Sequence, residues 1–445
     1  MPPHVRVDRR ASGLRSLSRS VIATLLLTSV LALPATAQDT SPRADTGPSP
    51  SAEPLPEGFN ARMVKEVRRI VAEVDPVRQL PAAKDISYRV IDQATFMGEL
   101  EALLREEYPP AYLDAEDDAL TRLGLLGPDD DLEQLILHIY DQQVLAYYDP
   151  RTATFSLIGP VQKIGPFESL IVAHEYDHAL QDAAFDLEGS QLEDLDRSDA
   201  ILAQQALIEG DATAVMYDWA ARELKLSDLL AVSAQALTKQ DTRQLNRMPA
   251  ILRRQLEFPY IDGLAFVTAI RGRGDWPAVD AAWEDQPVST EQILHPELYP
   301  EEMPVDIELP SIAEALGPDW TTSYEQTLGE MQIGVWVADG QRAKSLFPVL
   351  PAQLPNAEAA AGWGGDRLVS LDGPDGAWAV VWQTDWDTAV DRKQFLAAAR
   401  TAMTDLPGAH AAIDADVAGG LSSPVLVLVA DSKDTLIAVR EALDL

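Results

Sequence analysis

The spacing of apolar residues predicts a helix that begins near residue 60, followed by further helices and a β-hairpin. The helical stripe is formed by Met63, Val67, Ile70, Val71 and Val74. Residues at such spacings lie on one face of a helix, so the stripe is expected to face a core. Two β-prone runs follow at 143–148 and 153–158, and the Asp-Pro-Arg-Thr sequence between them is typical of a turn. We therefore expect a mostly helical region with a small antiparallel sheet.

Two longer helical patterns lie after the hairpin. The first spans Phe167 to Phe185, and Pro166 stands where the first turn of a helix tolerates proline. Its apolar positions are Leu170, Ile171, Ala173, Leu180, Ala184 and Phe185. The second pattern runs from about Asp199 to Leu224, after an acidic loop. We expect both segments to be helical.

The pattern changes after a proline-rich stretch at 295–310, which we interpret as a domain boundary. Beyond this stretch, β-prone and helical runs alternate. The β-prone runs are 333–337, 378–384 and 425–429, and the helical runs lie near 391–404 and 433–443. The sequence thus predicts an α+β protein, with a mostly helical domain at 59–305 and a smaller α+β domain at 306–445.

The first 37 residues have the layout of a secretory signal peptide. Five arginines precede an apolar run from Val21 to Leu33, and Ala35 and Ala37 are small residues suited to cleavage before Gln38. An uncleaved anchor is the alternative, although the apolar run is short for a spanning helix. Residues 38–58 are rich in Pro, Ser, Ala and Thr, which indicates a linker. We expect a secreted or extracytoplasmic protein with no stable membrane insertion after cleavage.

The composition limits the partners of such a protein. The chain has 35 Lys and Arg residues and 71 Asp and Glu residues; removal of residues 1–37 takes away five basic residues and one acidic residue, which leaves a formal charge of −40. So acidic a surface repels nucleic acid and anionic membranes and can attract cationic substrates. The chain contains no cysteine, so a large core must stabilise an exported form and no thiolate is available as a metal ligand.

The segment with the most specific chemistry is His174-Glu175-Tyr176-Asp177-His178, a His-Glu-x-x-His motif. Residues four apart on a helix have Cβ atoms about 5–6 Å apart, so both imidazoles can reach one metal ion at about 2.0–2.1 Å. Glu175 would flank the ion and act as the base when a zinc-activated water hydrolyses a peptide bond. The alternative is a pair of core or surface histidines on an ordinary amphipathic helix, but the helical pattern around the motif favours the zinc site.

A catalytic zinc ion takes three protein ligands and keeps one position open for water. We predict Glu209 as the third ligand, because Gly210 and Ala212 beside it are small enough to let two helices approach closely around an ion. The competing candidate on the same helix is Asp211, which would point to another side. Further candidates in the acidic loop and at its exit are Glu188, Glu193 and Asp199. Asp182 and Asp211 are candidates for holding an imidazole N–H.

Stabilisation of a developing oxyanion usually needs a further hydrogen-bond donor. His295, in a Leu-His-Pro-Glu sequence, is our candidate for this catalytic role. Tyr217 and Tyr260 are alternatives, although a tyrosine on an apolar face more often belongs to the core. His138 lies in an apolar helical run, and we interpret it as a packed histidine.

The His-Glu-x-x-His motif followed by Glu209 on a downstream helix resembles the gluzincin branch of zinc metallopeptidases. The segments 174–182, 209–212 and 289–296 also resemble uncharacterised bacterial secreted gluzincin-like proteins, over about residues 60–390. The resemblance implies a zincin-like domain in which the two histidines and Glu209 bind Zn²⁺.

The chain departs from the thermolysin-like pattern at Thr213, where that pattern has an aspartate four residues after the third ligand. The segment 362–367, Gly-Trp-Gly-Gly-Asp-Arg, resembles a recurring element of the same secreted group. It does not complete a phosphate-binding loop, so we interpret it as a tight turn.

These features predict a secreted, zinc-dependent metallopeptidase that acts on a peptide or protein substrate. In zincins an edge strand before the metal helix holds the extended substrate by strand addition, and either strand of the predicted hairpin is a candidate for that edge. Two alternatives remain. One is a zinc-binding, gluzincin-like fold that serves as a non-catalytic binding or envelope-associated protein, and the other is a hydrolase of non-peptide amides or esters.

Overall fold

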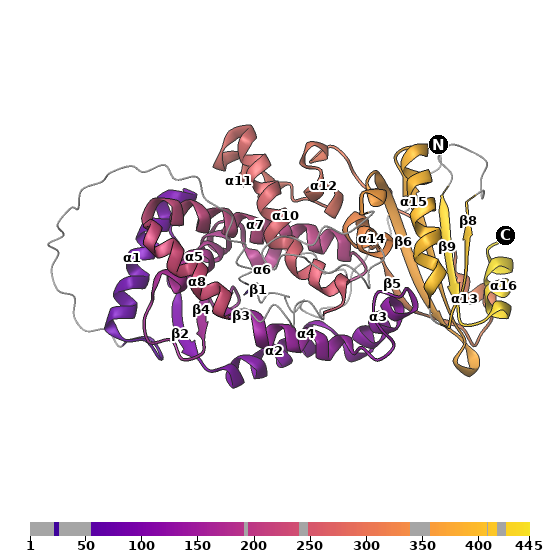
Figure 1. Ribbon diagram of the computed structural model, residues 1–445, viewed down its shortest axis with the longest axis horizontal. Coiled ribbons are helices and arrows are strands. Elements are labelled where there is room, and N and C mark those ends of the chain that lie inside the picture. The colour runs from indigo at the N-terminus through magenta and orange to yellow at the C-terminus, as the bar shows by residue number, and fades with distance from the viewer. Residues whose placement is uncertain are drawn as a thin grey trace, which may run out of the picture.

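The computed structural model describes residues 22–25, 55–190, 195–239, 248–338, 357–406, 408–415 and 424–445. The signal peptide predicted at 1–37 and the linker predicted at 38–58 lie outside the described residues, except for 22–25 and 55–58. The described chain is α+β, with helices predominating and two small sheets towards the two ends of the long axis (Figure 1). Among the described helices, none combines the length and the apolarity needed to cross a bilayer.

Helices form most of the part that precedes residue 300. They are α1 (Ala61–Arg78), α2 (Gln93–Glu107), α3 (Pro110–Arg122), α4 (Leu132–Gln143), α5 (Pro166–Phe185), α6 (Leu187–Ser190), α7 (Ser198–Glu223), α8 (Leu226–Lys239), α10 (Ala250–Gly274), α11 (Trp276–Glu284) and α12 (Thr290–Leu294). The stripe on α1 faces the core as predicted: Met63, Ile70 and Val74 are wholly inaccessible, and Val71 is partly buried against the same core. The two longer helical patterns are α5 and α7. Pro166 is in the first turn of α5, and the Glu168 carboxylate accepts a hydrogen bond from the backbone N–H of Gly165.

The first sheet has four strands in the order β1-β3-β4-β2. They are β1 (Ile22–Leu25), β2 (Ser87–Ile91), β3 (Val144–Asp149) and β4 (Thr154–Ile158). β3 and β4 form the predicted antiparallel hairpin, β2 runs parallel to β4, and β1 pairs antiparallel with the outer edge of β3. Tyr148 belongs to the main core, which includes residues of α5, whereas Tyr147 belongs to a smaller cluster with Phe96. Successive side chains of β3 thus lie on opposite faces of the sheet.

Helices α7 and α10 make backbone contact at a pair of glycines. A Cβ atom on Gly210 would lie 2.3 Å from the carbonyl carbon of Gly263, and a Cβ atom on Gly263 would lie 2.1 Å from the carbonyl oxygen of Ala206. No side chain fits between the helices at this crossing. Gly210 therefore allows the close approach of α7 to α10. It does not lie at the contact between α7 and α5, the helix that carries the histidine motif.

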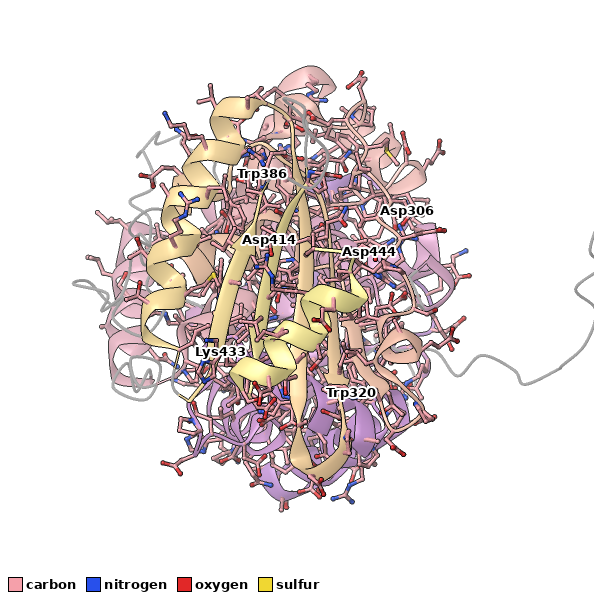
Figure 2. The ribbon with its side chains drawn as sticks, turned by 90° about the vertical axis from the view of Figure 1, so that its right-hand side faces the viewer. Asp306, Trp320, Trp386, Asp414, Lys433 and Asp444 are labelled. Carbon is pink, nitrogen blue, oxygen red and sulfur yellow. The ribbon has the colours of Figure 1, made fainter. Side chains whose placement is uncertain are left out.

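The second sheet is antiparallel throughout and has the strand order β5-β6-β7-β9-β8. Its strands are β5 (Thr321–Gln326), β6 (Trp363–Asp372), β7 (Trp378–Trp386), β8 (His410–Asp414) and β9 (Val425–Ala430), and its helices are α13 (Ile312–Leu316), α14 (Gly329–Val337), α15 (Ala389–Ala402) and α16 (Lys433–Ala442). Short 3₁₀ turns lie at Pro296–Leu298, Ala357–Ala360, Pro374–Gly376 and Met403–Asp405. One face of this sheet joins the main core through Trp363 and Trp382, and Phe395 of α15 packs against Trp382 there. The other face packs against α13 and α16, and Figure 2 shows α16 lying across it between Lys433 and Asp444.

Two sequence predictions in this part are wrong. The run 333–337 lies in helix α14 and not in a strand. Every residue of α14 is buried, and the run 333–337 within it is wholly apolar, so this run carries no helical periodicity. The segment 362–367 is not a tight turn, because β6 begins at Trp363 with a register shift before Gly365. The Asp366 carboxylate accepts hydrogen bonds from the backbone N–H groups of Leu328 and Gly329 at the start of α14.

The β-prone runs at 378–384 and 425–429 and the helical runs near 391–404 and 433–443 are confirmed as β7, β9, α15 and α16. The main hydrophobic core runs continuously from Met63 on α1 to Phe395 on α15, and so includes residues from both sides of the boundary predicted after residue 305. That boundary stays a prediction.

Candidate metal centre

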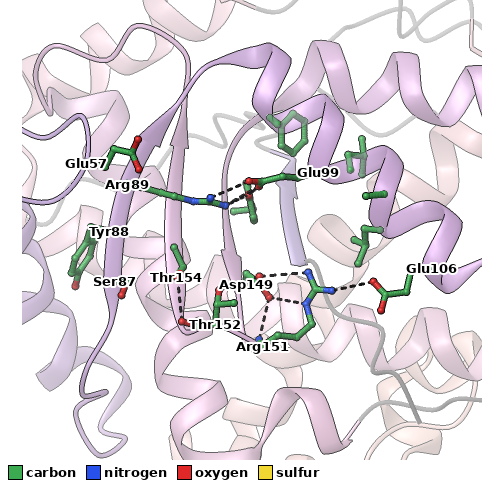
Figure 3. A pocket seen from close by; sticks show the side chains of 15 residues that line it. Glu57, Ser87, Tyr88, Arg89, Glu99, Glu106, Asp149, Arg151, Thr152 and Thr154 are labelled. Atoms are coloured by element: carbon green, nitrogen blue, oxygen red, sulfur yellow. Dashed lines mark hydrogen bonds and ion pairs between the residues drawn. The ribbon is translucent and has the colours of Figure 1, made fainter. Parts of the chain in front are cut away.

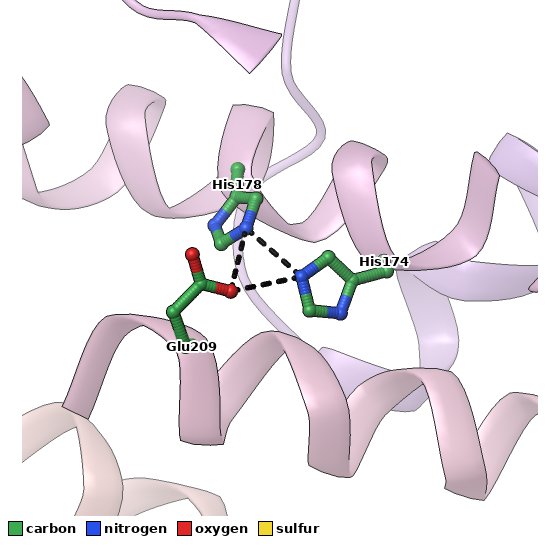
Figure 4. Close-up of side chains that lie close together, drawn as sticks. All are labelled: His174, His178 and Glu209. Carbon is green, nitrogen blue, oxygen red and sulfur yellow. Dashed lines mark hydrogen bonds and ion pairs between the residues drawn. The ribbon is translucent and has the colours of Figure 1, made fainter. Parts of the chain in front are cut away.

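Helices α5 and α7 bring His174, His178 and Glu209 together in the interior. Nε2 of His174 lies 3.1 Å from Oε2 of Glu209, and Nε2 of His178 lies 3.5 Å from the same oxygen. The two Nε2 atoms are 3.1 Å apart (Figure 4). Both histidines are inaccessible to solvent and Glu209 is only 6% exposed. Among the described residues, these three form the one group of His, Cys, Asp and Glu side chains able to hold a metal ion.

The spacing of the three donor atoms fits a single ion. Donors at about 2.0–2.1 Å from a tetrahedral zinc ion are about 3.3–3.4 Å from one another. The observed separations of 3.1, 3.1 and 3.5 Å bracket this value. The imidazole planes of His174 and His178 lie at 82° to each other, which allows both Nε2 atoms to face one point. The donor set, two imidazoles and a carboxylate, is one that zinc takes in catalytic sites.

Electrostatics keep the third donor ionised. Burial works to raise the pKa of Glu209, but the charge of His178 and hydrogen bonds from both histidines lower it to about 2. Burial works to lower the pKa of His178, but the charges of Glu209 and Glu175 and the hydrogen bonds to Glu209 and Gln181 together outweigh burial and raise this pKa to about 9. Burial lowers the pKa of His174. Glu209 therefore supplies negative charge at neutral pH, and a bound cation would displace the proton from His178.

Gln181, which the sequence analysis did not single out, orients His178. The Gln181 side-chain nitrogen donates to Oδ2 of Asp177 at 2.8 Å and to the backbone carbonyl of Ile208 at 3.1 Å. Its side-chain oxygen therefore faces Nδ1 of His178, 3.0 Å away, and accepts a hydrogen bond from it. This fixes the tautomer in which the Nε2 lone pair is free to bind a metal. Gln181 lies three residues after His178 on α5, and that spacing was the available signal.

The two aspartates considered for this orienting role bind other partners. Asp182 accepts a hydrogen bond from the Tyr148 hydroxyl at 2.8 Å. Asp211 accepts hydrogen bonds from Nε of Arg78 at 2.9 Å and from the Trp283 indole at 2.9 Å. None of these hydrogen bonds joins Asp182 or Asp211 to a histidine of the motif. The two aspartates instead tie α5 to β3, and α7 to α1 and α11.

The competing candidates for the third ligand lie elsewhere. Asp211 is occupied by Arg78, Asp199 accepts hydrogen bonds from Thr290, and Glu188 is exposed on α6. Glu193 lies outside the described residues. Thr213, at the position of the thermolysin-like aspartate, is buried, and its hydroxyl makes no hydrogen bond within the described structure.

Glu175 lies directly beside the first histidine and is completely buried. It lines a small cavity of about 10 Å³ that Tyr88, Tyr148 and Tyr176 also line. The negative charge of Glu175 contributes to the raised pKa of His178, so the Glu175 carboxylate is within electrostatic range of that ring.

The candidate oxyanion donors are separated by the fold. His295 follows α12, and its Nε2 atom lies 2.9 Å from Oε1 of Glu330 on α14. The Tyr260 ring on α10 lies 6.2 Å from the His174 ring, measured between centroids, with the planes 30° apart. Tyr217 lies on α7 beyond Glu209, and His138 lies on α4. Of these candidates, Tyr260 is the one that lies beside a histidine of the His-Glu-x-x-His motif.

Two larger cavities lie near the sheet and the metal centre. One, of about 360 Å³, is lined by both Glu209 and Tyr260. The other, of about 570 Å³, lies between the first sheet and α2 and is lined by none of His174, His178 and Glu209 (Figure 3). In it, Arg89 is paired with Glu99 at 2.8 Å and Arg151 with Asp149 at 3.0 Å. Both arginines are thus neutralised by carboxylates.

Comparison with known proteins bears on a different part of the chain. The model of a domain of unknown function, DUF8575, matches residues 319–441, which include the second sheet and α14 to α16. No curated protein and no solved structure matches the chain. The family match does not reach α5 or α7.

Proposed function

We propose that the protein is a zinc-dependent peptidase of the gluzincin type, with a zincin-like domain that contains α5 and α7. One observation carries the proposal: the Nε2 atoms of His174 and His178 and Oε2 of Glu209 converge within 3.1–3.5 Å in a buried site. Buried histidines four apart, with an anionic carboxylate from a second helix, are the donor set of a hydrolytic zinc site. The secreted or extracytoplasmic location predicted from residues 1–37 is part of this proposal.

Zinc bound at this site would polarise a substrate carbonyl and lower the pKa of a coordinated water to about 7. His174, His178 and Glu209 would hold the ion, and Gln181 would keep the His178 ring in its binding orientation. Glu175 would take a proton from the attacking water on its carboxylate and pass that proton to the leaving nitrogen. The Tyr260 hydroxyl is better placed than His295 to donate a hydrogen bond to the developing oxyanion, because its ring lies beside His174.

The outer edge of β3 supports a peptide as the substrate. This edge pairs antiparallel with an extended segment of the chain, with Ile22 opposite Tyr148 and Thr24 opposite Ala146. β3 also packs against α5, the helix that carries the histidine motif. An edge strand that accepts an extended segment can bind a peptide through main-chain hydrogen bonds.

A cleavage assay with removal and return of zinc tests the proposal. The purified protein is incubated with casein and with a mixed peptide library, before and after treatment with a chelator. We expect cleavage that the chelator abolishes and zinc restores. Cleavage that survives complete metal removal would contradict the metal mechanism. A folded, zinc-loaded protein that cleaves no peptide would contradict the peptidase assignment and favour a binding role or another hydrolase.

A further inference from the structure

The cavity of about 360 Å³ that Glu209 and Tyr260 line is elongated. Its lining residues follow helix α7 from Ser198, the first residue of that helix, to Glu209. At a rise of 1.5 Å per residue this stretch of α7 is about 16 Å long, which exceeds the length of any amino-acid side chain. The cavity volume spread over that length gives a mean cross-section of about 20 Å². The cavity is therefore a narrow channel, about as wide as one unbranched alkyl chain, with Glu209 at one end.

The walls of this channel are mainly aliphatic. Helices α2, α3, α4, α7, α10 and α14 contribute to them, and half of the lining residues are leucine or isoleucine. Leu104, Ile139, Leu202 and Leu252 are examples from four of these helices, and all four are buried. The described residues that line the channel include no lysine, arginine or histidine. An apolar group that enters the channel therefore leaves water for an aliphatic environment, which is favourable.

Several polar groups in the walls already have partners within the protein. The Ser198 hydroxyl donates a hydrogen bond to the carbonyl of Thr327 at 3.0 Å. Glu116 accepts a hydrogen bond from Tyr324, and Glu107 also interacts with neighbouring residues. A peptide main chain inside the channel would bury an N–H and a C=O group at each residue, and the aliphatic walls offer these groups few partners. An alkyl chain has no polar group to satisfy, so it suits the channel better.

We propose that the channel binds a long unbranched alkyl chain carried by a residue next to the scissile bond, so that the substrate is a lipidated peptide or protein. The main chain of the substrate would lie along the outer edge of β3, and its alkyl chain would enter the channel beside Glu209. Val144 of β3 and the channel residues Leu256 and Tyr260 belong to one hydrophobic cluster, so the strand and the channel adjoin. The inference deepens the proposed function and rests on it, because it assigns a substrate class to the same site.

A series of fluorogenic peptides tests the inference on the full-length, zinc-loaded protein. One residue on either side of the scissile bond is replaced in turn by amino acids with linear alkyl side chains of one to twelve carbons. We expect kcat/KM at one position to rise by up to about fourfold for each added methylene, the factor that corresponds to its transfer out of water. The rise should continue beyond four carbons, the length of the norleucine side chain. The Kd of the same peptides for the metal-free protein, measured by fluorescence anisotropy, should fall with chain length in parallel.

Ile201→Trp tests the channel itself. Ile201 lines the cavity about two turns before Glu209 and is half-buried, so a larger side chain there would close the part of the channel farthest from Glu209. The ratio of kcat/KM for the twelve-carbon chain to that for the four-carbon chain should fall at least about tenfold, because several methylenes lose their place in the channel. Ala221→Trp is the matched control, since Ala221 is exposed in the last turn of the same helix and does not line the cavity. It should leave the ratio unchanged.

The possible failures are distinguishable. A wild-type enzyme that cleaves peptides but has its highest kcat/KM at four carbons or fewer, at both positions, overturns the channel assignment and leaves the peptidase proposal intact; this profile decides even if Ile201→Trp does not fold. A folded Ile201→Trp protein with the wild-type ratio also overturns it. If the folded, zinc-loaded protein cleaves none of these peptides nor casein, the proposed function itself fails, and the substrate class assigned here fails with it.

Discussion

The side-chain oxygen of Gln181 lies 3.0 Å from Nδ1 of His178, while the nitrogen of the same amide is bonded to Asp177 and to the carbonyl of Ile208. Both ends of the amide are therefore fixed by partners within α5 and α7. The consequence is that the His178 ring is oriented by the protein itself, with Nε2 directed at Nε2 of His174 and at Glu209.

Gln181→Ala should weaken zinc binding by about 10–100-fold, because it removes the acceptor that holds the His178 ring. Zinc affinity is measured by competition with a chelator of known affinity. Asp182→Asn is the control on the next position, since Asp182 contacts Tyr148 and not a motif histidine, and it should change zinc affinity far less. A Gln181→Ala protein that binds zinc as tightly as wild type would show that Gln181 has no orienting role.

Gly210→Ala should destabilise the protein, because its new methyl group would lie 2.3 Å from the backbone of Gly263. Overpacking of this kind costs about 1–3 kcal/mol. We expect a cost near the upper end of this range, because the neighbouring atoms belong to the backbone of Gly263 and cannot easily move away. Denaturant unfolding monitored by circular dichroism measures the change.

Gly98→Ala on α2 is the control for that experiment, since a Cβ atom there has nothing within 4 Å. It should stabilise the protein by about 0.5–1 kcal/mol, because alanine favours a helix more than glycine does. Equal stability of Gly210→Ala and wild type would mean that the α7–α10 crossing is looser than the structure indicates.

The free energy of unfolding of Glu291→Gln, relative to that of wild type, should increase as pH rises. Glu291 is 3% exposed, and burial together with the charges of Glu330 and Asp387 raises its pKa to about 9. Between about pH 4.3, the unperturbed value, and pH 9 the folded state thus keeps a proton that the unfolded state has lost. The contribution of Glu291 to the free energy of unfolding is therefore favourable at low pH and is lost as pH rises through that window. Glutamine does not titrate, so the variant does not lose stability in this way.

The measurement compares the free energy of unfolding of Glu291→Gln and wild type at pH 5 and pH 9. The difference, variant minus wild type, should be more positive at pH 9. Glu284→Gln, on the exposed end of α11, is the control for the same change in formal charge. A difference that does not vary with pH would mean that Glu291 is ionised in the folded protein at neutral pH.

The sequence predicted those parts of the fold and site that depend on local spacing. The i, i+4 spacing of His174 and His178 places both rings on one face of a helix, and a β-hairpin precedes that helix as its turn sequence indicates. Glu209 was chosen from local context, and the fold brings it to the two histidines.

The remaining features depend on tertiary packing, which spacing does not encode. The run 333–337 is buried on all sides in α14, so its apolar sequence fitted a strand equally well. The Tyr260 ring reaches His174 only because α10 crosses α7 at two glycines, and His295 is instead paired with Glu330. The cavity of about 360 Å³ that Glu209 lines is assembled from six helices, so no single segment reveals it.

Zinc content and peptide hydrolysis, measured together on wild type, Glu175→Gln and Glu209→Ala, test the central claim most directly. Glu188→Ala serves as a control, because Glu188 is an exposed acidic residue outside the site. We expect wild type and the control to hold one zinc ion per chain and to cleave. Glu175→Gln should keep zinc and lose activity by about 10²–10⁴-fold, and a folded Glu209→Ala should lose zinc. A wild-type protein without zinc, or a fully active Glu175→Gln, would contradict the account.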